Sequence, residues 1–299
     1  MKQLNQNFEK LPKERIAEFC ICCGSKKLKN SPAVLMPFVA ERVFNWKQIK
    51  IDKTWGLNTI KNGQTYSICN TLVCSKCNFL FLDIRFSDRE LSNLYNNYRG
   101  IKYTKLREKY ERNYEKRNKD LIKGITYLDE VEKFILKNIK LPVSILDWGG
   151  DTGKNTPFKN HSKKIHIYDI GNSKTVNGTI KVSKSNLKNR KYDLIVCSNV
   201  LEHVSYPSET LFDIKKNMSS KSLLYIELPY EKLIIEIENK KKSYESKKHW
   251  HEHVNFFSKK SILKLLKKCK LKLVDFRKLD VAEGNFSLMQ IICKKDFDQ

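Results

Sequence analysis

An acid and a loop of closely spaced glycines follow a short apolar run in the middle of the chain. Residues 144–146 lead into Asp147, Trp148 and the loop Gly149-Gly150-Asp151-Thr152-Gly153. Glycine has no Cβ, so such a loop can turn sharply and let a ligand approach its backbone. Asp169 lies 22 positions after Asp147 and ends the next apolar run. A loop and a second acid at this spacing predict a Rossmann-like domain, in which Asp169 binds the ribose of an adenosine-containing cofactor.

Four of the nine cysteines form two C-x-x-C pairs, Cys20 with Cys23 and Cys74 with Cys77. Each pair can offer two thiolates from a tight turn, and four thiolates complete a tetrahedral zinc site. A redox role would need a C-x-x-C at the start of a helix in a thioredoxin-like pattern, which the sequence does not show. We therefore predict structural zinc, with Cys22 and Cys69 as nearby thiols that could compete as ligands.

An alternation of strand-like and helix-like segments follows Pro142. We predict seven strands, near residues 143–147, 165–169, 179–183, 192–198, 222–228, 271–277 and 286–293. Helices are predicted near 207–219 and 258–270, where Pro207 and Ser258 suit a helix start. This alternation predicts an α/β fold with a mainly parallel, Rossmann-like sheet of seven strands covered on both faces.

Three regions follow from these patterns: a small N-terminal zinc-binding domain over 1–87, a helical linker or lid over 88–140, and the α/β domain over 141–299. In the linker, apolar residues recur at three- and four-residue steps from Leu121 to Ile135, which predicts one amphipathic helix. A tyrosine-rich stretch precedes it: Tyr95, Tyr98, Tyr103, Tyr110 and Tyr114. These tyrosines suit either a packing stripe or an acceptor-binding lid, since Tyr combines a flat apolar ring with a hydrogen-bonding tip.

The chain has 299 residues and a net charge of +25. Such a charge fits a polyanionic partner, but lysines spread along the whole chain also fit an ordinary solubilised surface. The sequence contains no apolar run of the roughly 18 to 20 residues that a membrane span needs, and its first residues lack the apolar core of a secretory signal. We therefore expect a cytoplasmic protein without a membrane span.

These motifs together resemble the class I S-adenosylmethionine-dependent methyltransferases, which share a seven-stranded Rossmann-like fold. The family's loop reads D-x-G-x-G-x-G, and Asp151 stands here in place of the central glycine, where it could crowd the cofactor or add an acceptor. The segment from Tyr192 to Val204 is similar to the family's fourth strand with its "vlEHv" ending. The resemblance implies that the cofactor is held by Asp147, Trp148, Gly149, Gly150, Gly153, Asp169, Ser198 and Asn199.

A narrower resemblance combines both halves of the chain. A four-cysteine zinc unit before this domain is similar to bacterial methyltransferases that modify sugars and nucleotide sugars, including relatives encoded with surface-polysaccharide enzymes. Their Y-H-E-H-x-x-Y-F-like segment corresponds to the run from Trp250 to Phe257, with Trp250 in place of tyrosine. The resemblance implies that Glu252 and His253 bind the acceptor and remove its proton, and histidine suits that task near pH 7.

Alternatives remain open at this point. His251 or His253 could simply pack or cap a loop, and His249, His251 and His253 would share one face of an extended segment, as metal ligands might. His203 could line the pocket or be structural. The function that we expect is methyl transfer to a small sugar-type acceptor; a nucleic-acid methyltransferase or binder, and a cofactor-binding protein without catalysis, are the alternatives.

Overall fold

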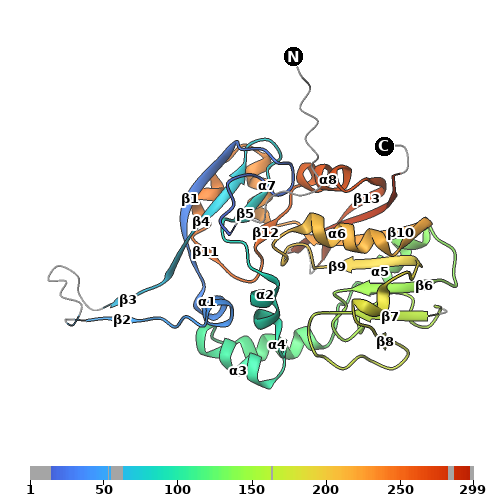
Figure 1. Cartoon of the computed structure of the whole chain (residues 1–299), viewed down its shortest axis with the longest axis horizontal. Helices are drawn as coiled ribbons and strands as arrows, with labels where there is room; N and C mark the ends of the chain where they lie inside the picture. Colours follow the sequence, from blue (N-terminus) through green and yellow to red (C-terminus); the bar gives the residue numbers. More distant parts are fainter. Residues whose placement is uncertain (1–14, 53, 55–62, 163, 282–285, 297–299) are drawn as a thin grey trace, which may run out of the picture.

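Seven strands form the larger of the two main sheets in the computed structural model, which describes residues 15–52, 54, 63–162, 164–281 and 286–296 (Figure 1). Their order across the sheet is β13-β14-β10-β9-β6-β7-β8. The strands are β6 (Ser144–Trp148), β7 (Lys164–Tyr168), β8 (Ile180–Lys181), β9 (Tyr192–Ser198), β10 (Met218–Pro229), β13 (Leu271–Val281) and β14 (Phe286–Lys295). All seven predicted strands are confirmed, and so is the Rossmann-like α/β fold.

The sheet is mainly parallel, as expected. β6 pairs parallel with both β7 and β9, and parallel pairing continues outward to β8 on one side and β10 on the other. β14 lies antiparallel to both β10 and β13, so it alone among these seven strands runs in the opposite direction. The carboxyl ends of β6, β7 and β9 therefore meet at one edge of the sheet, where ligands bind in open α/β folds.

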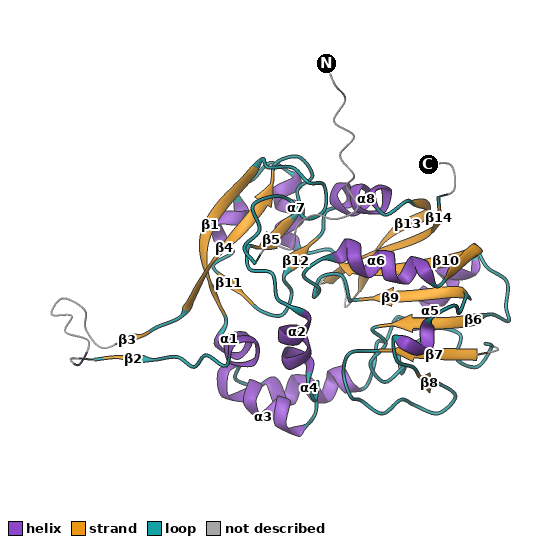
Figure 2. Ribbon diagram, in the orientation of Figure 1, coloured by secondary structure: helices purple, strands orange, loops and turns teal. Residues whose placement is uncertain are grey.

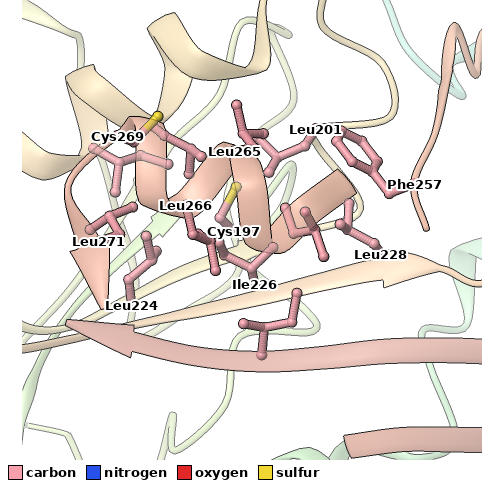
Figure 3. Packing of buried hydrophobic residues seen from close by; sticks show 14 of the residues in the cluster. Cys197, Leu201, Leu224, Ile226, Leu228, Phe257, Leu265, Leu266, Cys269 and Leu271 are labelled. Atoms are coloured by element: carbon pink, nitrogen blue, oxygen red, sulfur yellow. The ribbon is translucent and has the colours of Figure 1, made fainter. Parts of the chain in front are cut away.

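Helices cover both faces of this sheet. Successive side chains of a strand point to opposite faces of a sheet, so alternate residues of β9 pack in two different hydrophobic cores. Ile195 and Cys197 pack with α6 (Pro207–Lys216) and α8 (Lys259–Lys268), whereas Leu194 and Val196 pack with α5 (Leu128–Leu136). Figure 3 shows Leu265 and Leu266 of α8 lying over Cys197 and the strand residues Leu224 and Ile226.

A second sheet has five strands in the order β11-β1-β4-β5-β12 (Figure 2). It contains β1 (Leu28–Leu35), β4 (Ser67–Cys74) and β5 (Leu80–Leu82), to which the two short strands β11 (His249–Trp250) and β12 (Asn255–Phe256) add at the edges. A hairpin of β2 (Lys50–Ile51) and β3 (Gly63–Gln64) extends from it. Residues 249–256 thus belong to the sheet of the N-terminal region, although they follow five strands of the α/β domain in sequence order.

Short helices follow the strands of the second sheet. They are α1 (Pro37–Phe44), α2 (Asp88–Tyr95), α3 (Ile101–Tyr110) and α4 (Tyr114–Ile122), and α7 (Lys232–Glu238) lies beyond β10. In sequence order, α2 to α5 lie between β5, the last central strand of the second sheet, and β6, the first strand of the larger sheet. The single amphipathic helix predicted over 121–135 is wrong. The chain breaks at Gly124, whose φ is +96°, between α4 and α5, so that Leu121 and Ile122 are exposed rather than buried with α5.

Candidate active site

The glycine loop after β6 passes very close to the segment that follows β9. Gly149 has a φ of +81°, and a Cβ built on it would lie 2.4 Å from Cγ2 of Val200. No side chain fits there, so glycine at this position is required both by conformation and by space. The loop and the end of β9 consequently meet to form one wall of a cavity, which both Gly149 and Val200 line.

Asp169 lies just beyond β7 at the same edge of the sheet. Its carboxylate accepts hydrogen bonds from the backbone N–H groups of Asp151, at 2.9 Å, and Gly171, at 2.6 Å. Burial raises the pKa of Asp169, an effect that these two hydrogen bonds oppose. Asp151 adopts φ +48°, a left-handed conformation that Asp tolerates better than most residues. It lines the cavity and adds a carboxylate there.

The cavity has a volume of about 850 Å³, within the range of small-molecule and cofactor sites. It lies between the carboxyl ends of β6, β7 and β9 on one side and α2 on the other. Four of the predicted cofactor residues line it: Trp148, Gly149, Asp169 and Asn199. Its size and its position at the strand ends suit S-adenosylmethionine.

The other four predicted cofactor residues stand behind this lining. Asp147 is 5% exposed and accepts a hydrogen bond from the Thr156 hydroxyl at 2.5 Å, and burial raises its pKa to about 6. Gly150 lies against the Asp147 carboxylate, and Gly153 adopts φ +74° where the loop turns. Ser198 donates a hydrogen bond to Glu227. These residues shape the loop and the strand end rather than the surface of the cavity.

Glu227 of β10 organises the back of the site. It is 1% exposed, yet its carboxylate accepts hydrogen bonds from five side chains: Tyr127, Ser198, Asn199, Tyr225 and Gln290, at 2.6 to 3.2 Å. Such a network satisfies a buried carboxylate and fixes its donors. Asn199, which lines the cavity, is therefore held in place from behind by Glu227.

Tyr95, His203 and His253 come together from three parts of the chain; Tyr95 and His203 line the cavity, whereas His253 and Glu252 are not among its lining residues. Nδ1 of His203, which follows β9, lies 2.8 Å from the hydroxyl of Tyr95 of α2 and 3.1 Å from the backbone carbonyl of Glu252. The rings of His203 and His253 lie edge to face, with centroids 4.6 Å apart. Burial lowers the pKa of both histidines, that of His253 to about 3, and the neighbouring His203 adds to the effect on His253. Both imidazoles are therefore neutral near pH 7.

Glu252 forms an ion pair that ties it to the helical region. Arg107 of α3 donates two hydrogen bonds to its carboxylate, at 2.7 and 3.0 Å, and another to Glu111 at 3.0 Å. Burial alone would raise the pKa of Glu252, but the charge and hydrogen bonds of Arg107 outweigh it and hold the pKa at about 2. Glu252 is thus an ionised partner of Arg107, and its carboxylate is not disposed to accept a proton.

Some tyrosines of the tyrosine-rich stretch pack in the core, and others line the cavity. Tyr103 and Tyr114 are buried, and Tyr103 packs edge to face on Tyr98. Tyr95 and Tyr98 line the cavity. One end of the stretch is accordingly core and the other is part of the site.

The four cysteines of the two C-x-x-C pairs converge. Cys20 and Cys77 lie with their Sγ atoms 3.6 Å apart, as do Cys23 and Cys74, and all four sulfurs lie within 4.8 Å of one another. A tetrahedral zinc ion with bonds of about 2.3 Å separates its sulfur ligands by about 3.8 Å. The cluster therefore fits zinc, which these four thiolates would hold in a closed structural site. Cys22 and Cys69 are buried outside this group.

Several residues of the site were not predicted from the sequence. Arg107 lies 145 positions from Glu252, and nothing local marks the pair. Arg85 is fully buried and donates to the backbone carbonyls of Leu82 and Ser205 and to the side chain of Asn255, which joins the second sheet to the turn after β9. Burial lowers its pKa to about 10. The only signal of this role in the sequence is that an arginine follows a strand-like run.

The sheet order, the glycine loop, the acid after β7 and the cavity between them define an S-adenosylmethionine-dependent methyltransferase. The sequence places it further: the chain belongs to the family described as a methyltransferase domain, whose profile matches residues 110–275, more than half of its length. The predicted enzyme class is confirmed. A search of curated proteins found no match.

Solved structures with this fold include several methyltransferases. The 1,6-didemethyltoxoflavin N1-methyltransferase of Burkholderia thailandensis, solved with S-adenosylhomocysteine, is 12% identical with a TM-score of 0.48, over 60% of this chain and 83% of that one. A methyltransferase from Methanosarcina mazei is 15% identical with a TM-score of 0.41, over 55% and 97%. The magnesium protoporphyrin IX methyltransferase of Synechocystis is 12% identical with a TM-score of 0.41, over 56% and 82%. These similarities are too low to carry an argument about the acceptor.

Membrane insertion through a helix has no support in the described part of the chain. Its longest helices have 10 residues, whereas a span of the bilayer takes about 20 apolar ones.

Proposed function

We propose that this methyltransferase transfers the methyl group of S-adenosylmethionine to a sugar or a sugar-linked small molecule, in the biosynthesis of a surface polysaccharide or a related product. The observation that carries the proposal is that Tyr95 and His203 meet at the cavity wall, with His253 packed against His203 and the Arg107–Glu252 pair beside it. The resemblance of the zinc unit and of the segment from Trp250 to Phe257 to sugar methyltransferases supports the same acceptor class.

The lining of the cavity supports a small acceptor over a polyanion. Its charged side chains are nearly balanced, with four basic (Arg15, Arg85, Arg89 and Lys184) and five acidic (Asp88, Asp151, Asp169, Glu209 and Asp213). A nucleic-acid site would be expected to present a basic groove. The aromatic and imidazole rings on its wall suit the flat faces and hydroxyls of a sugar. The net charge of +25 is the observation that keeps nucleic acid as the second candidate.

The residues of the site have distinct roles in this proposal. S-adenosylmethionine, when bound, supplies a methyl group on a sulfonium. Holding the acceptor in line with that methyl group supplies much of the rate. His253, neutral near pH 7, accepts the acceptor's proton, and Glu231, whose Oε1 lies 3.9 Å from Nδ1 of His253, stabilises the imidazolium that forms. Glu252 positions the loop that carries His253 through its ion pair with Arg107.

A methylation assay with labelled S-adenosylmethionine tests the acceptor class. Zinc-loaded protein is offered a panel of nucleotide sugars and, separately, RNA of mixed sequence. We expect turnover with at least one nucleotide sugar and none above background with RNA. Methylation of RNA with no sugar modified would contradict the proposal and favour the second candidate.

His253→Ala tests the proton acceptor, with His161→Ala, an exposed histidine outside the site, as its control. Loss of a positioned base lowers rates by about 10²- to 10⁴-fold. We expect a fall of that order in kcat for His253→Ala, and wild-type rates for the control. If His253→Ala turned over normally, its assignment as base would be wrong.

A further inference from the structure

Two buried glutamates near the site have opposite surroundings. Glu227 is 1% exposed and accepts five side-chain hydrogen bonds, as described above. Glu202, in the turn after β9, is 2% exposed, and neither oxygen of its carboxylate has a hydrogen-bond donor within the part of the chain that the structure describes. Buried carboxylates are rarely left without a partner. The Glu202 carboxylate is therefore buried without a hydrogen-bond donor among the described residues.

Two imidazoles face this carboxylate. Nε2 of His203 lies 3.9 Å from Oε1 of Glu202. The backbone carbonyl of Glu202 accepts hydrogen bonds from the N–H groups of Val254, at 2.8 Å, and Asn255, at 3.0 Å, which fixes His253 beside it. One donor atom from each of Glu202, His203 and His253 lies within 4.8 Å of the other two.

The two contacts of His203 Nδ1 favour the tautomer in which Nε2 faces Glu202 with a lone pair. The Glu252 carbonyl, 3.1 Å from Nδ1, can only accept, and the Tyr95 hydroxyl, 2.8 Å from the same atom, can donate or accept. A proton on Nδ1 is the arrangement that satisfies both contacts. Nε2 is then unprotonated and directed toward Glu202. A histidine that donates one ring N–H to a carbonyl while the other nitrogen is free has the arrangement typical of metal ligands.

We propose that Glu202, His203 and His253 bind a divalent transition-metal cation at the wall of the cavity. Two imidazoles and one carboxylate are a donor set for Zn²⁺, Co²⁺ or Mn²⁺, and three protein ligands leave a position open. Bonds of about 2.1 Å place tetrahedral ligands about 3.4 Å apart, so donor atoms within 4.8 Å of one another need to approach by at most about 1.4 Å.

The charges around the cluster favour a cation. Glu202 contributes one buried carboxylate, and Glu231 lies 3.9 Å from His253, where it offsets the positive charge of Lys247 that also acts on His253. Glu252 is neutralised by Arg107, so that arginine does not oppose a cation with an unpaired charge. His203 lines the cavity and joins the cluster to it. The open position of the cation is thus placed to take an oxygen of a bound acceptor.

This site goes beyond the proposed function, and it stands or fails separately from it. His253 is the proton acceptor of the cation-free protein; with a cation bound, its lone pair is committed to the metal, and an acceptor hydroxyl on the cation would instead lose its proton to solvent more readily. Cation binding that occurs without any sugar turnover would contradict only the proposed function. Sugar turnover by protein that binds no such cation would contradict only the site.

Titration of the full chain with Co²⁺ tests the site, after the cysteine cluster has been loaded with Zn²⁺. We expect one further equivalent to bind, seen by calorimetry, with an absorption spectrum that lacks thiolate charge-transfer bands. His253→Ala and Glu202→Gln should each weaken this binding at least tenfold, and His161→Ala should leave it unchanged.

Titration of the wild-type protein is the first test of the cation site. Folded, zinc-loaded protein that binds no further Co²⁺ or Mn²⁺ up to millimolar concentration would overturn the proposal. Binding that neither variant weakens would overturn it as well. Because Glu202 is buried and its substitution can destabilise the fold, circular dichroism accompanies each titration. His253 is about one-third exposed on a loop, so its variant provides the test if Glu202→Gln does not fold.

Discussion

At the scale of single residues, the site depends on ion pairs and burial that set which groups are charged. Glu252 and His253 are adjacent in sequence, yet Arg107 keeps the first ionised while burial keeps the second neutral. The surroundings of the two residues thus determine their roles. Glu252 holds the loop through its ion pair, and His253 offers a lone pair.

Arg107→Met tests the contribution of the ion pairs that Arg107 forms with Glu252 and Glu111. It leaves the Glu252 carboxylate buried without its partner, which typically costs about 3–5 kcal/mol. We expect the free energy of unfolding, measured in urea, to fall by that amount. The double variant Arg107→Met/Glu252→Gln removes the unpaired charge and should regain part of the loss. Equal stability of the single and double variants would contradict this explanation.

Asp147 predicts a pH dependence of stability. Burial raises its pKa from 3.8 to about 6, so folding favours the protonated carboxyl. Its contribution is complete below pH 3.8 and is lost as the pH rises through 6, to a total of about 3 kcal/mol. Asp147→Asn should therefore gain stability relative to wild type between pH 4.5 and 7.5 in thermal unfolding. The exposed Asp129→Asn serves as the control, and a parallel pH profile for both variants would count against the explanation.

At the scale of elements, α8 links the four-cysteine cluster to the seven-stranded sheet. Its N-cap, Ser258, accepts the N–H of Ser261, and its hydroxyl donates to the backbone carbonyl of Cys77 at 2.6 Å. Ile262, Leu265 and Leu266 on one face of α8 pack in the same core as the cysteines. A single helix start thus joins two regions that are far apart in sequence.

Ser258→Ala should destabilise the protein through this link. Loss of an N-cap costs about 1 kcal/mol, and up to about 2. The Cys77 carbonyl also loses its donor, so we expect a fall at the upper end of that range in urea unfolding. Ser92→Ala, at an exposed position in α2, should change stability little. An equal effect of the two substitutions would show that the cap is not important.

At the scale of the whole molecule, the two sheets share cores and cannot be separated by one cut in the sequence. Cys20, Cys74 and Cys77 pack with residues of β9, β10 and α8. β11 and β12, from residues 249–256, complete the N-terminal sheet and carry the loop with Glu252 and His253. The loop that approaches the cavity is thus positioned by the half of the molecule that carries the cysteine cluster.

Cys77→Ser tests this dependence. We expect elemental analysis to show loss of the zinc that wild type carries, and thermal unfolding to begin at a lower temperature, because structural zinc contributes folding energy. Cys69→Ala removes a buried thiol outside the cluster and should keep its zinc. Zinc retained by Cys77→Ser would contradict the four-cysteine assignment.

The sequence predicted the features that depend on local pattern. Strand alternation, the loop at Asp147 and the cap at Ser258 are each visible within a few residues, and the structure has all of them. It did not predict the break at Gly124, because an isolated glycine in a helical pattern is often tolerated. Nor did it predict the Arg107–Glu252 pair or the edge strands 249–256, since such contacts between distant segments leave no periodic signal.

Calorimetric titration of the zinc-loaded protein with S-adenosylmethionine tests the central claim most directly, which is that the cavity at the ends of β6, β7 and β9 holds this cofactor. We predict one site per chain, and at least tenfold weaker binding by Asp169→Ala, which removes the carboxylate expected to bind the ribose. The control, His161→Ala, should bind as wild type does. No binding by the folded, zinc-loaded wild type, or binding that is unchanged in Asp169→Ala, would contradict the account.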